Sequence, residues 1–439
     1  MTLIATPPAP ESGEYSTIDA GRIRVGATLF APVYDVRNVL LLAEGQTVTE
    51  AFLERLRDHR IQTVRVHDRD IDRFILPSPV PLIEPAGTAK DVPPDRPGSV
   101  AAYRNEASDR LDAEICLDRL QMPRQGEPFL TGVRHRGKNP YEADVRARIV
   151  ASYNRSMSRL SRVYDRLAAG DGLDRAALDE LADRALSDLG EDGDLFACLG
   201  GNPAAGGYPV RHSLNTAMLA MAVGVRLGLD TPTLRELVIG CLVHDAGMLL
   251  LDRNVYDHAS GIDVARFLEI TKHPILVFDV LKDTGAIPKR SAFIAYQMHE
   301  RCDGSGYPRR RAGSQIHFLS KVAGLADAYV ALVSPRSHRP AMMPYHAMEK
   351  ILRDANRGLF DCGVVRALLR TLSLFPLGSY VELSDGRRAR VLRAGEEYHR
   401  PVVEICGGPP ERPETIDLAE ERTISVVRAL PATAVAAAG

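Results

Sequence analysis

The chain has 439 residues, of which 45% are hydrophobic, which is enough for a sizeable core in two or three domains. Its 55 basic and 57 acidic residues leave a formal net charge of -2, so binding of a nucleic acid polymer through a basic surface is excluded. The six cysteines are scattered and form no CxxC pair, which favours free thiols in a reducing compartment. We therefore expect a cytoplasmic protein.

No segment of the sequence predicts a membrane anchor. The longest apolar stretches, near residues 217–225 and 237–243, are too short to span a bilayer and lie within amphipathic patterns. Residues 1–15 lack the basic and apolar segments of a secretory signal. The sequence thus predicts no membrane span.

The first part of the chain alternates short β-type runs with one amphipathic segment. Residues 1–20 are expected to form a disordered tail. Residues 21–75 predict a small α+β domain, with β-type runs at 39–42 and 63–66 on either side of a helical pattern at 48–59. Thr49 is the expected N-cap of that helix, because its hydroxyl can accept a hydrogen bond from the first turn. Residues 76–140 are first Pro-rich and then charged, which is typical of a linker.

Helical periodicity dominates residues 141–374. Apolar residues recur at helical spacing in segments 147–153, 173–189, 213–227, 232–251, 262–281, 291–299, 320–332 and 345–353. Residues 375–430 then carry β-type runs separated by turn residues, which predicts a small β module, and residues 431–439 are an expected tail. The predicted fold class is mainly α: an all-α helical bundle core flanked by a small N-terminal α+β domain and a small C-terminal β module.

Four histidines and two aspartates in the helical region are candidate metal ligands. His244 and Asp245 are adjacent on an expected helix, where a carboxylate can bind one cation and bridge to another through its second oxygen. Taken alone, this dipeptide is better explained as a helix end with a capping aspartate. Asp327 lies in a helix of small residues, where a carboxylate facing the core needs a cation or hydrogen bonds. The ligands of a metal centre could be supplied by this pair, Asp327 and three further histidines, His212, His273 and His299.

A glycine-rich turn follows the last of these histidines, in the run His299-Glu300-Arg301-Cys302-Asp303-Gly304-Ser305-Gly306-Tyr307-Pro308. Gly304 and Gly306 permit backbone geometries closed to other residues, and Pro308 restricts the chain after Tyr307. We expect this loop to form the wall of a pocket. Tyr307 is either a surface on which a base stacks or a packed side chain, and the sequence favours neither.

These residues, in this order and spacing, resemble the HD-GYP domain, a branch of the HD superfamily of metal-dependent phosphohydrolases. The resemblance covers residues 141–374 and includes the complete Gly306-Tyr307-Pro308 motif. It implies an HD-type helical fold that hydrolyses cyclic di-GMP to pGpG or GMP at a centre of iron or manganese ions. Two metals suit this reaction, because they hold the phosphoryl oxygens and make the attacking water more acidic.

The resemblance also implies a role for each matching position. One metal would be bound by His212, His244, Asp245 and Asp327. The second would share Asp245 and be bound by His273, His299 and a further histidine at position 298. His244 and Asp245 are the expected catalytic residues. The expected substrate-binding residues are Asp303, Gly304, Gly306, Tyr307, Pro308, Arg336 and Arg339, of which the two arginines suit phosphate oxygens.

Four positions depart from the family pattern. Met298 offers only a thioether, a poor ligand for Mn²⁺ or Fe²⁺, so we expect one or two divalent metals with a weaker second site. Met248 replaces a lysine near the scissile phosphate, and the loss of one such electrostatic group costs on the order of 3 kcal/mol in the barrier. Tyr208 replaces a glutamate that recruits a third metal, and Val330 replaces an aspartate outside the metal-ligand set.

Two functions therefore stay open. The first is a cyclic di-GMP phosphodiesterase with one metal or a weak pair of metals. The second is a catalytically impaired domain that acts as a cyclic di-GMP sensor or a protein-interaction module. Six retained ligands favour the enzyme, because buried imidazoles and carboxylates are costly in a pure interaction module. The flanking domains are expected to form a homodimer or to contact a signalling protein, although no motif identifies that partner.

Overall fold

The computed structural model of the chain describes residues 15–19, 31–35, 40–43, 46, 48–59, 61, 63–67, 70, 103–117, 126–133, 137–202, 206–256, 263–281, 284–336, 339–407 and 414–431. The chain divides into two compact units, Met1–Asp95 and Arg96–Gly439. The tail predictions for residues 1–14 and 432–439, and the linker prediction for residues 76–102, lie outside the described residues.

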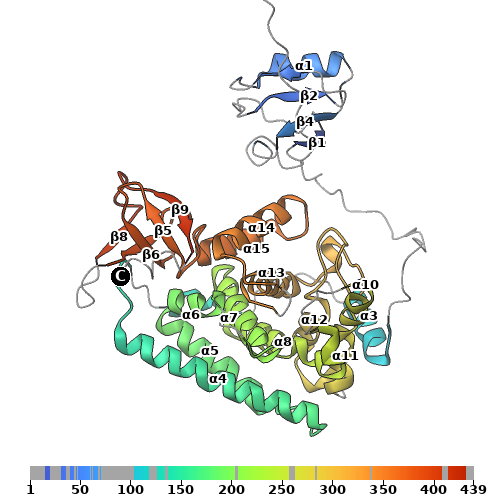
Figure 1. The fold of residues 1–439 in the computed structure, drawn as a ribbon. Helices are drawn as coiled ribbons and strands as arrows, with labels where there is room; N and C mark the ends of the chain where they lie inside the picture. The colour runs from blue at the N-terminus through green and yellow to red at the C-terminus, as the bar shows by residue number, and fades with distance from the viewer. Residues whose placement is uncertain are drawn as a thin grey trace, which may run out of the picture. The chain divides into compact units, whose positions relative to one another are not determined.

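The smaller unit is an antiparallel sheet with one helix (Figure 1). The strands β1 (Tyr15–Asp19), β2 (Val33–Asp35), β3 (Leu40–Leu42) and β4 (Thr63–His67) pair in the order β1-β4-β2-β3. Helix α1 (Glu50–Asp58) packs its apolar side chains into a core shared with β2 and β4. Thr49 Oγ1 accepts a hydrogen bond from the Phe52 amide at 3.2 Å, which confirms the predicted N-cap. Residues 15–19 were predicted to belong to a disordered tail. In the structure they form strand β1, which pairs with β4 along its whole length.

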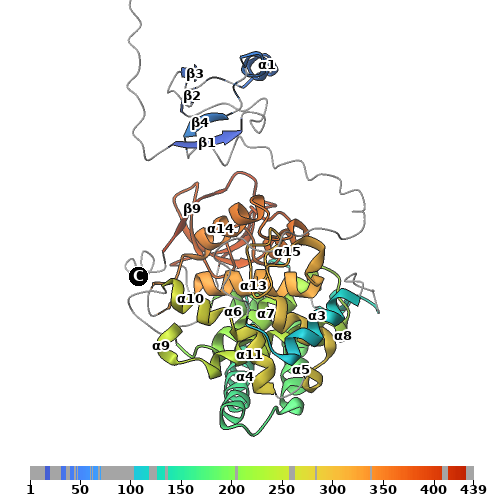
Figure 2. The same cartoon turned by 90° about the vertical axis from the view of Figure 1, so that its right-hand side faces the viewer.

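The larger unit is built mainly of helices (Figures 1 and 2). They are α3 (Glu106–Leu117), α4 (Ala143–Ala169), α5 (Arg175–Glu191), α6 (Gly193–Gly201), α7 (Val210–Arg226), α8 (Thr231–Val243), α9 (Arg253–Tyr256), α10 (Val264–Ile270), α11 (His273–Leu281), α12 (Lys289–Gln297), α13 (Phe318–Val333), α14 (Pro344–Asn356) and α15 (Cys362–Leu372). Short 3₁₀ segments are η2 (Phe129–Gly132), η3 (His244–Leu250), η4 (Thr284–Ala286) and η5 (Gly313–Gln315).

Helix α7 is the centre of this bundle. Every residue from His212 to Val225 is buried, and α4, α6, α8, α13 and α15 pack around the helix. A helix that is apolar on all sides must be enclosed in this way. The predicted fold class, with a mainly α core and two small sheet-containing parts that precede and follow it in the chain, is therefore confirmed. None of the helices in the described part of the chain combines the length and apolar character needed to cross a bilayer.

Several helices differ from the apolar pattern in the sequence. The predicted helix at residues 232–251 ends at Val243 and continues as the 3₁₀ segment η3. In the described part of residues 262–281 the chain forms α10 and α11, with Pro274 in the first turn of α11, where a missing amide hydrogen does no harm. Helix α3 lies within the predicted linker, yet it packs Leu111 and Ile115 against the bundle.

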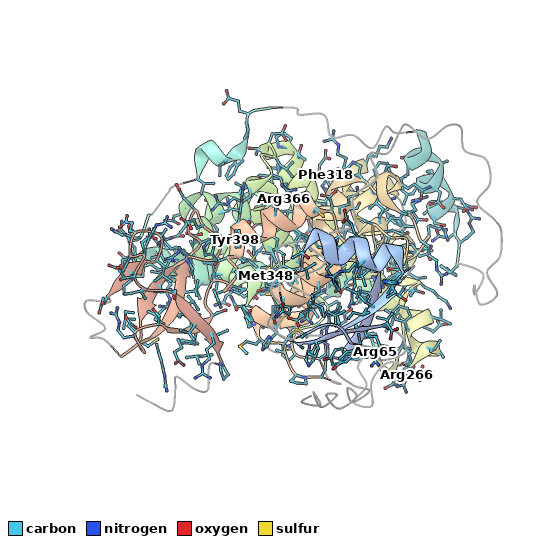
Figure 3. The ribbon with its side chains drawn as sticks, turned by 90° about the horizontal axis from the view of Figure 1, so that it is seen from above. Arg65, Arg266, Phe318, Met348, Arg366 and Tyr398 are labelled. Carbon is cyan, nitrogen blue, oxygen red and sulfur yellow. The ribbon has the colours of Figure 1, made fainter. Side chains whose placement is uncertain are left out.

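The C-terminal β module is confirmed as an antiparallel sheet. Its strands β5 (Tyr380–Leu383), β6 (Arg388–Arg393), β7 (Val402–Ile405), β8 (Thr415–Asp417) and β9 (Val426–Leu430) pair in the order β8-β7-β6-β5-β9. Arg393 joins this sheet to the bundle, because its guanidinium lies 3.1 Å from the carboxylate of Asp192, which also caps α6. Figure 3 labels the buried Met348 of α14 and the exposed Tyr398, which follows β6.

The Arg393–Asp192 pair predicts a strong effect on stability. Arg393→Ala should lower the free energy of unfolding of the larger unit by about 3 kcal/mol, because it leaves a buried carboxylate without its cation. Both side chains are only 2% exposed, so water cannot replace the lost partner. Denaturant unfolding of the full chain, followed by circular dichroism, measures the change. Arg422→Ala removes an exposed partner of Glu397 and should cost less than about 1 kcal/mol.

Candidate metal centre

Separate segments of the bundle bring the six predicted ligands to one buried place. His212 lies in the first turn of α7, the His244-Asp245 pair begins η3, and Asp327 lies in α13. His273 begins α11, and His299 follows α12. None of the six is more than 7% exposed. The fold therefore brings the six candidate ligands together in the core.

A close approach between η3 and α11 joins the two halves of the centre. A Cβ atom at Gly247 would lie 2.1 Å from the carbonyl oxygen of His273 and 2.7 Å from the amide nitrogen of Val277, so only glycine fits. This contact brings Nε2 of His273 to 3.4 Å from Oδ1 of Asp245. The prediction that His244 and Asp245 lie on a regular α-helix is wrong, because the chain tightens into η3 at His244.

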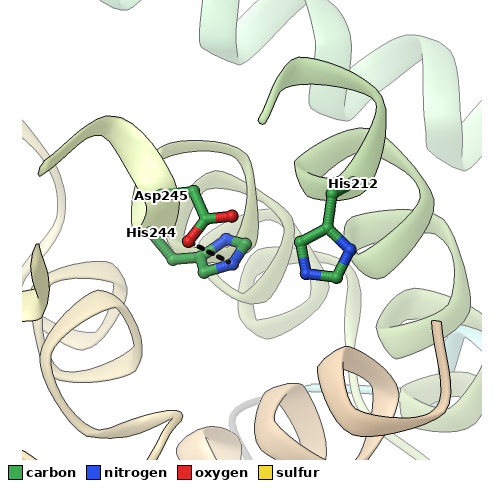
Figure 4. Close-up of side chains that lie close together, drawn as sticks. All are labelled: His212, His244 and Asp245. Atoms are coloured by element: carbon green, nitrogen blue, oxygen red, sulfur yellow. Dashed lines mark ion pairs between the residues drawn. The ribbon is translucent and has the colours of Figure 1, made fainter. Parts of the chain in front are cut away.

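The ligand atoms form two groups that share Asp245. One group contains His212, His244 and Asp245, and the other contains Asp245, His273 and His299. Within each group, one donor atom of every residue lies within 4.8 Å of the others. Figure 4 shows the first group, in which Nε2 of His244 lies 3.3 Å from Oδ1 of Asp245. In the second group, the Nε2 atoms of the two histidines are 2.9 Å apart.

Asp327 lies beside both groups. Its Oδ1 is 2.8 Å from Nε2 of His212 and 3.8 Å from Nε2 of His244, while its Oδ2 is 3.5 Å from Nδ1 of His299. The family resemblance implies that Asp327 binds the first metal alone. In the structure its carboxylate faces ligands of both groups.

The protonation states of these residues suit a divalent cation. Burial opposes ionisation of Asp245, but the four surrounding imidazoles lower its pKa to about 2. Asp327 is buried as well, and His299 and His212 hold its pKa well below the usual value. Burial lowers the pKa of His212, and burial together with His299 lowers the pKa of His273 to about 3. Ionised carboxylates and neutral imidazoles are the forms that bind metals.

Unpartnered polar atoms provide a test of the fit. Among the described residues, Nδ1 of His212, Nε2 of His244 and Oδ2 of Asp245 are buried and have no hydrogen-bond partner. Such atoms are costly in a protein core unless something coordinates them. Nδ1 of His244 and Nδ1 of His273 lie 2.7 Å from the carbonyl oxygens of Cys241 and Ile270, a contact that orients each ring and turns Nε2 toward the centre. The residues present therefore fit a divalent metal.

The predicted substrate loop lies against the metal centre. The ring of Tyr307 stacks on the ring of His299, with centroids 4.9 Å apart and planes at 9°. The edge of Phe267 meets Tyr307 at a centroid distance of 6.0 Å. One face of Tyr307 is therefore covered by a predicted ligand, and the side chain as a whole is half-buried.

The glycine-rich turn after His299 is fixed by close backbone contacts and by Glu300, for which the sequence predicted no role. A Cβ atom at Gly306 would lie 2.4 Å from the amide nitrogen of Arg301, and Gly304 has a φ of +81°.

The buried carboxylate of Glu300 accepts hydrogen bonds from the amides of Arg309 and Arg311, at 2.7 and 2.9 Å. Burial raises the pKa of Glu300 to about 7. Asp303 accepts hydrogen bonds from the amide and hydroxyl of Ser305, and Pro308 follows Tyr307 at the end of the turn.

The two predicted phosphate-binding arginines differ in their surroundings. The guanidinium of Arg336 lies 4.2 Å from the ring centre of Tyr208 and forms no ion pair with a described residue. Its charge contributes to the lowered pKa of His212, so it lies within electrostatic reach of the centre. Arg339 instead donates to the carbonyl oxygens of Ala331 and Leu332 near the end of α13. The predicted phosphate contact therefore suits Arg336, whereas Arg339 is engaged in holding the helix end.

The positions that depart from the family pattern lie around the centre or in the core. Met298 is 0% exposed and Met248 is 1% exposed, so neither thioether reaches solvent. Val330 is buried in α13 beyond Asp327. The ring of Tyr208 lies 5.9 Å from that of His212, and burial together with the carboxylate of Asp245 raises the pKa of Tyr208 well above its usual value.

Residues 198–364 match the HD domain family. The chain is 27% identical over 238 residues to a cyclic di-GMP phosphodiesterase of Pseudomonas aeruginosa, a match that covers 54% of this chain and 57% of the relative. It is 27% identical over 190 residues to a cyclic di-GMP phosphodiesterase of Borreliella burgdorferi, covering 43% of this chain and 49% of the relative. This chain is an HD-GYP domain protein. It spans about half the length of these curated relatives.

Two further proteins were found to be similar to this chain. The chain is 27% identical over 165 residues to a 3'3'-cGAMP-specific phosphodiesterase of Vibrio cholerae, covering 37% of this chain and 38% of that protein. A solved structure of an HDG"Y"P protein from Bdellovibrio bacteriovorus superposes with a TM-score of 0.44 at 14% identity, covering 81% of this chain and 98% of the other.

We predict that metal binding at this centre depends on its buried histidines. His244→Ala should remove most of the divalent metal from the purified protein, because it deletes a donor from the group around Asp245. Elemental analysis by mass spectrometry measures metal per chain. His346→Ala, at an exposed histidine of α14, should leave the content unchanged. Equal metal content in both variants and the wild type would contradict the prediction.

Proposed function

We propose that this protein is a cytoplasmic, metal-dependent phosphodiesterase that hydrolyses cyclic di-GMP to pGpG or GMP, with a weakened second metal site. The observation that carries the proposal is the convergence of two ligand groups on the shared carboxylate of Asp245. The relatives are named as phosphodiesterases of cyclic dinucleotides, which supports the substrate class.

The residues of the site would have three roles: to bind the metals, to bind a phosphate and to line the pocket. His212, His244, Asp245 and Asp327 would hold one ion, and His273 and His299 would hold the second together with Asp245. Iron or manganese ions bound there would supply Lewis acidity toward the phosphodiester and its attacking water. Arg336 would bind a phosphate oxygen beside the centre, because its guanidinium carries a charge without an ionic partner among the described residues. The loop that ends at Pro308 would close one side of the substrate pocket.

The second metal site is the weaker one in this proposal. The Asp245–His273–His299 group lacks a further nitrogen donor, and the thioether of Met298 is a soft ligand inside the hydrophobic core. The buried Met248 provides no cation beside the reacting phosphate. These two methionines favour a second candidate function, in which the domain is a cyclic di-GMP sensor or a protein-interaction module. In either case the flanking units would mediate homodimerisation or contact with a signalling protein.

Turnover of cyclic di-GMP separates the two candidates. The full-length protein should convert cyclic di-GMP to pGpG or GMP when Mn²⁺ or Fe²⁺ is in excess, as measured by chromatography of the products. The double variant Met298→His, Met248→Lys should raise kcat by about ten-fold or more, because it adds one nitrogen donor and one cation at the site. Tight binding without turnover in the wild type, followed by turnover in the double variant, would support the sensor. Parallel reactions with 3'3'-cGAMP test the choice of dinucleotide.

Arg336 provides a test of substrate binding. Arg336→Ala should raise KM for cyclic di-GMP by about ten-fold or more, the scale of a lost charge-assisted hydrogen bond, and leave metal content unchanged. Steady-state kinetics at saturating Mn²⁺ measures the effect. Arg366→Ala, at an exposed arginine of α15 labelled in Figure 3, should behave as the wild type. A KM that is the same in all three proteins would remove Arg336 from the substrate site.

A further inference from the structure

Helix α3 lies outside residues 198–364, the part of the chain that matches the HD domain family, yet it touches the substrate loop. The contact is made by Asp112. Its Oδ1 accepts hydrogen bonds from the hydroxyl of Tyr296 at 2.7 Å and from Arg311 at 2.6 Å, and its Oδ2 accepts one from Nε of Arg309 at 3.0 Å. A guanidinium nitrogen of Arg104 lies 3.6 Å from the same oxygen. Both oxygens of this carboxylate are therefore in use.

The two arginines follow directly after the Gly306-Tyr307-Pro308 motif. Their backbone amides are held by Glu300, and their guanidinium groups are held by Asp112. The loop that carries Tyr307 against His299 thus returns to the bundle through a segment fixed at both backbone and side chain. Among the residues that the structure describes, Asp112 provides the only carboxylate that forms an ion pair with either guanidinium group.

The charges at this contact make Asp112 hard to replace. The side chains of Arg309, Arg311 and Asp112 are 17% exposed or less, so solvent screens their charges weakly. Both guanidinium carbons lie over the ring of Tyr296, at 6.0 and 5.8 Å from its centroid. Two cations beside one ring repel each other, and the negative charge of Asp112 offsets this repulsion. Without Asp112, the loop end would have to move so that the arginines could separate or reach water.

Other contacts attach α3 firmly at this place. Leu111 and Ile115 are buried in the main core, and α3 packs against α11 and α12 (Figures 1 and 2). Arg309 also donates to the hydroxyl of Ser108 and to the carbonyl oxygen of Tyr103. These contacts fix the position of the Asp112 carboxylate beside the loop.

We propose that Asp112 is a positioning residue that holds the Tyr307 loop beside the metal centre and so sets the affinity for the cyclic dinucleotide. The inference rests on the proposed function. Among the described residues, Asp112 forms no hydrogen bond or ion pair with the six candidate ligands or with Arg336, so it acts through Arg309 and Arg311. Its loss should change substrate binding while the metal centre stays intact.

The test compares Asp112→Ala with two matched variants of the full-length protein. Asp112→Ala should raise KM for cyclic di-GMP about ten-fold and change kcat less than about three-fold, with unchanged metal content, because the lost interactions are charge-assisted hydrogen bonds remote from the reacting atoms. Asp112→Glu, which keeps the charge, should recover most of the wild-type KM. Asp109→Ala removes an exposed carboxylate one turn away on the same helix and should have no effect.

Hydrogen exchange supplies a readout that does not depend on turnover. In Asp112→Ala the amides of residues 301–311 should exchange faster than in the wild type, while those of α7 keep their protection. Unchanged KM and unchanged exchange in Asp112→Ala would overturn the inference, as would loss of metal or of α7 protection, since Asp112 would then be needed for the fold. A wild type that does not cleave cyclic di-GMP overturns the proposed function instead. Faster loop exchange in Asp112→Ala would then still support the contact between α3 and the loop.

Discussion

The larger unit is organised around one buried carboxylate that must be surrounded by imidazoles. Asp245 is ionised although it is buried, because four histidines from separate segments hold its pKa at about 2. A charge in this position is tolerated only if its partners are placed accurately. Helices α7, α11, α12 and α13 and the segment η3 therefore have to meet at a single point, and the small residue Gly247 lets two of them touch.

The loop on the proposed substrate side of the site is held by a second set of charges. Glu300 and Asp112 hold the backbone and side chains of the two arginines that end the Tyr307 loop. One of these carboxylates belongs to the HD-GYP region and the other to a helix that precedes it in the chain. The position of the loop is consequently linked to an element that a match to the HD domain does not include.

Two buried methionines occupy positions where the family resemblance implies a histidine and a lysine. Met298 and Met248 are buried in a packed core, where thioethers are stable, and the remaining ligands still converge. What they remove is one nitrogen donor and one positive charge. In the proposed phosphodiesterase, metal binding would depend on the residues that are present, whereas the rate of turnover would depend on how far the metal pair tolerates those two losses.

The sequence by itself determined the class of fold, the N-cap at Thr49, the C-terminal β module and the six candidate ligands, because periodicity, capping and residue chemistry are local properties. Only the tertiary structure decided that Asp327 faces both ligand groups, since it meets His212 across 115 positions of the chain. Likewise, folding alone placed Arg339 at the end of α13 and Asp112 beneath the loop. Contacts between distant segments follow from how helices pack, and a single sequence carries no local pattern for them.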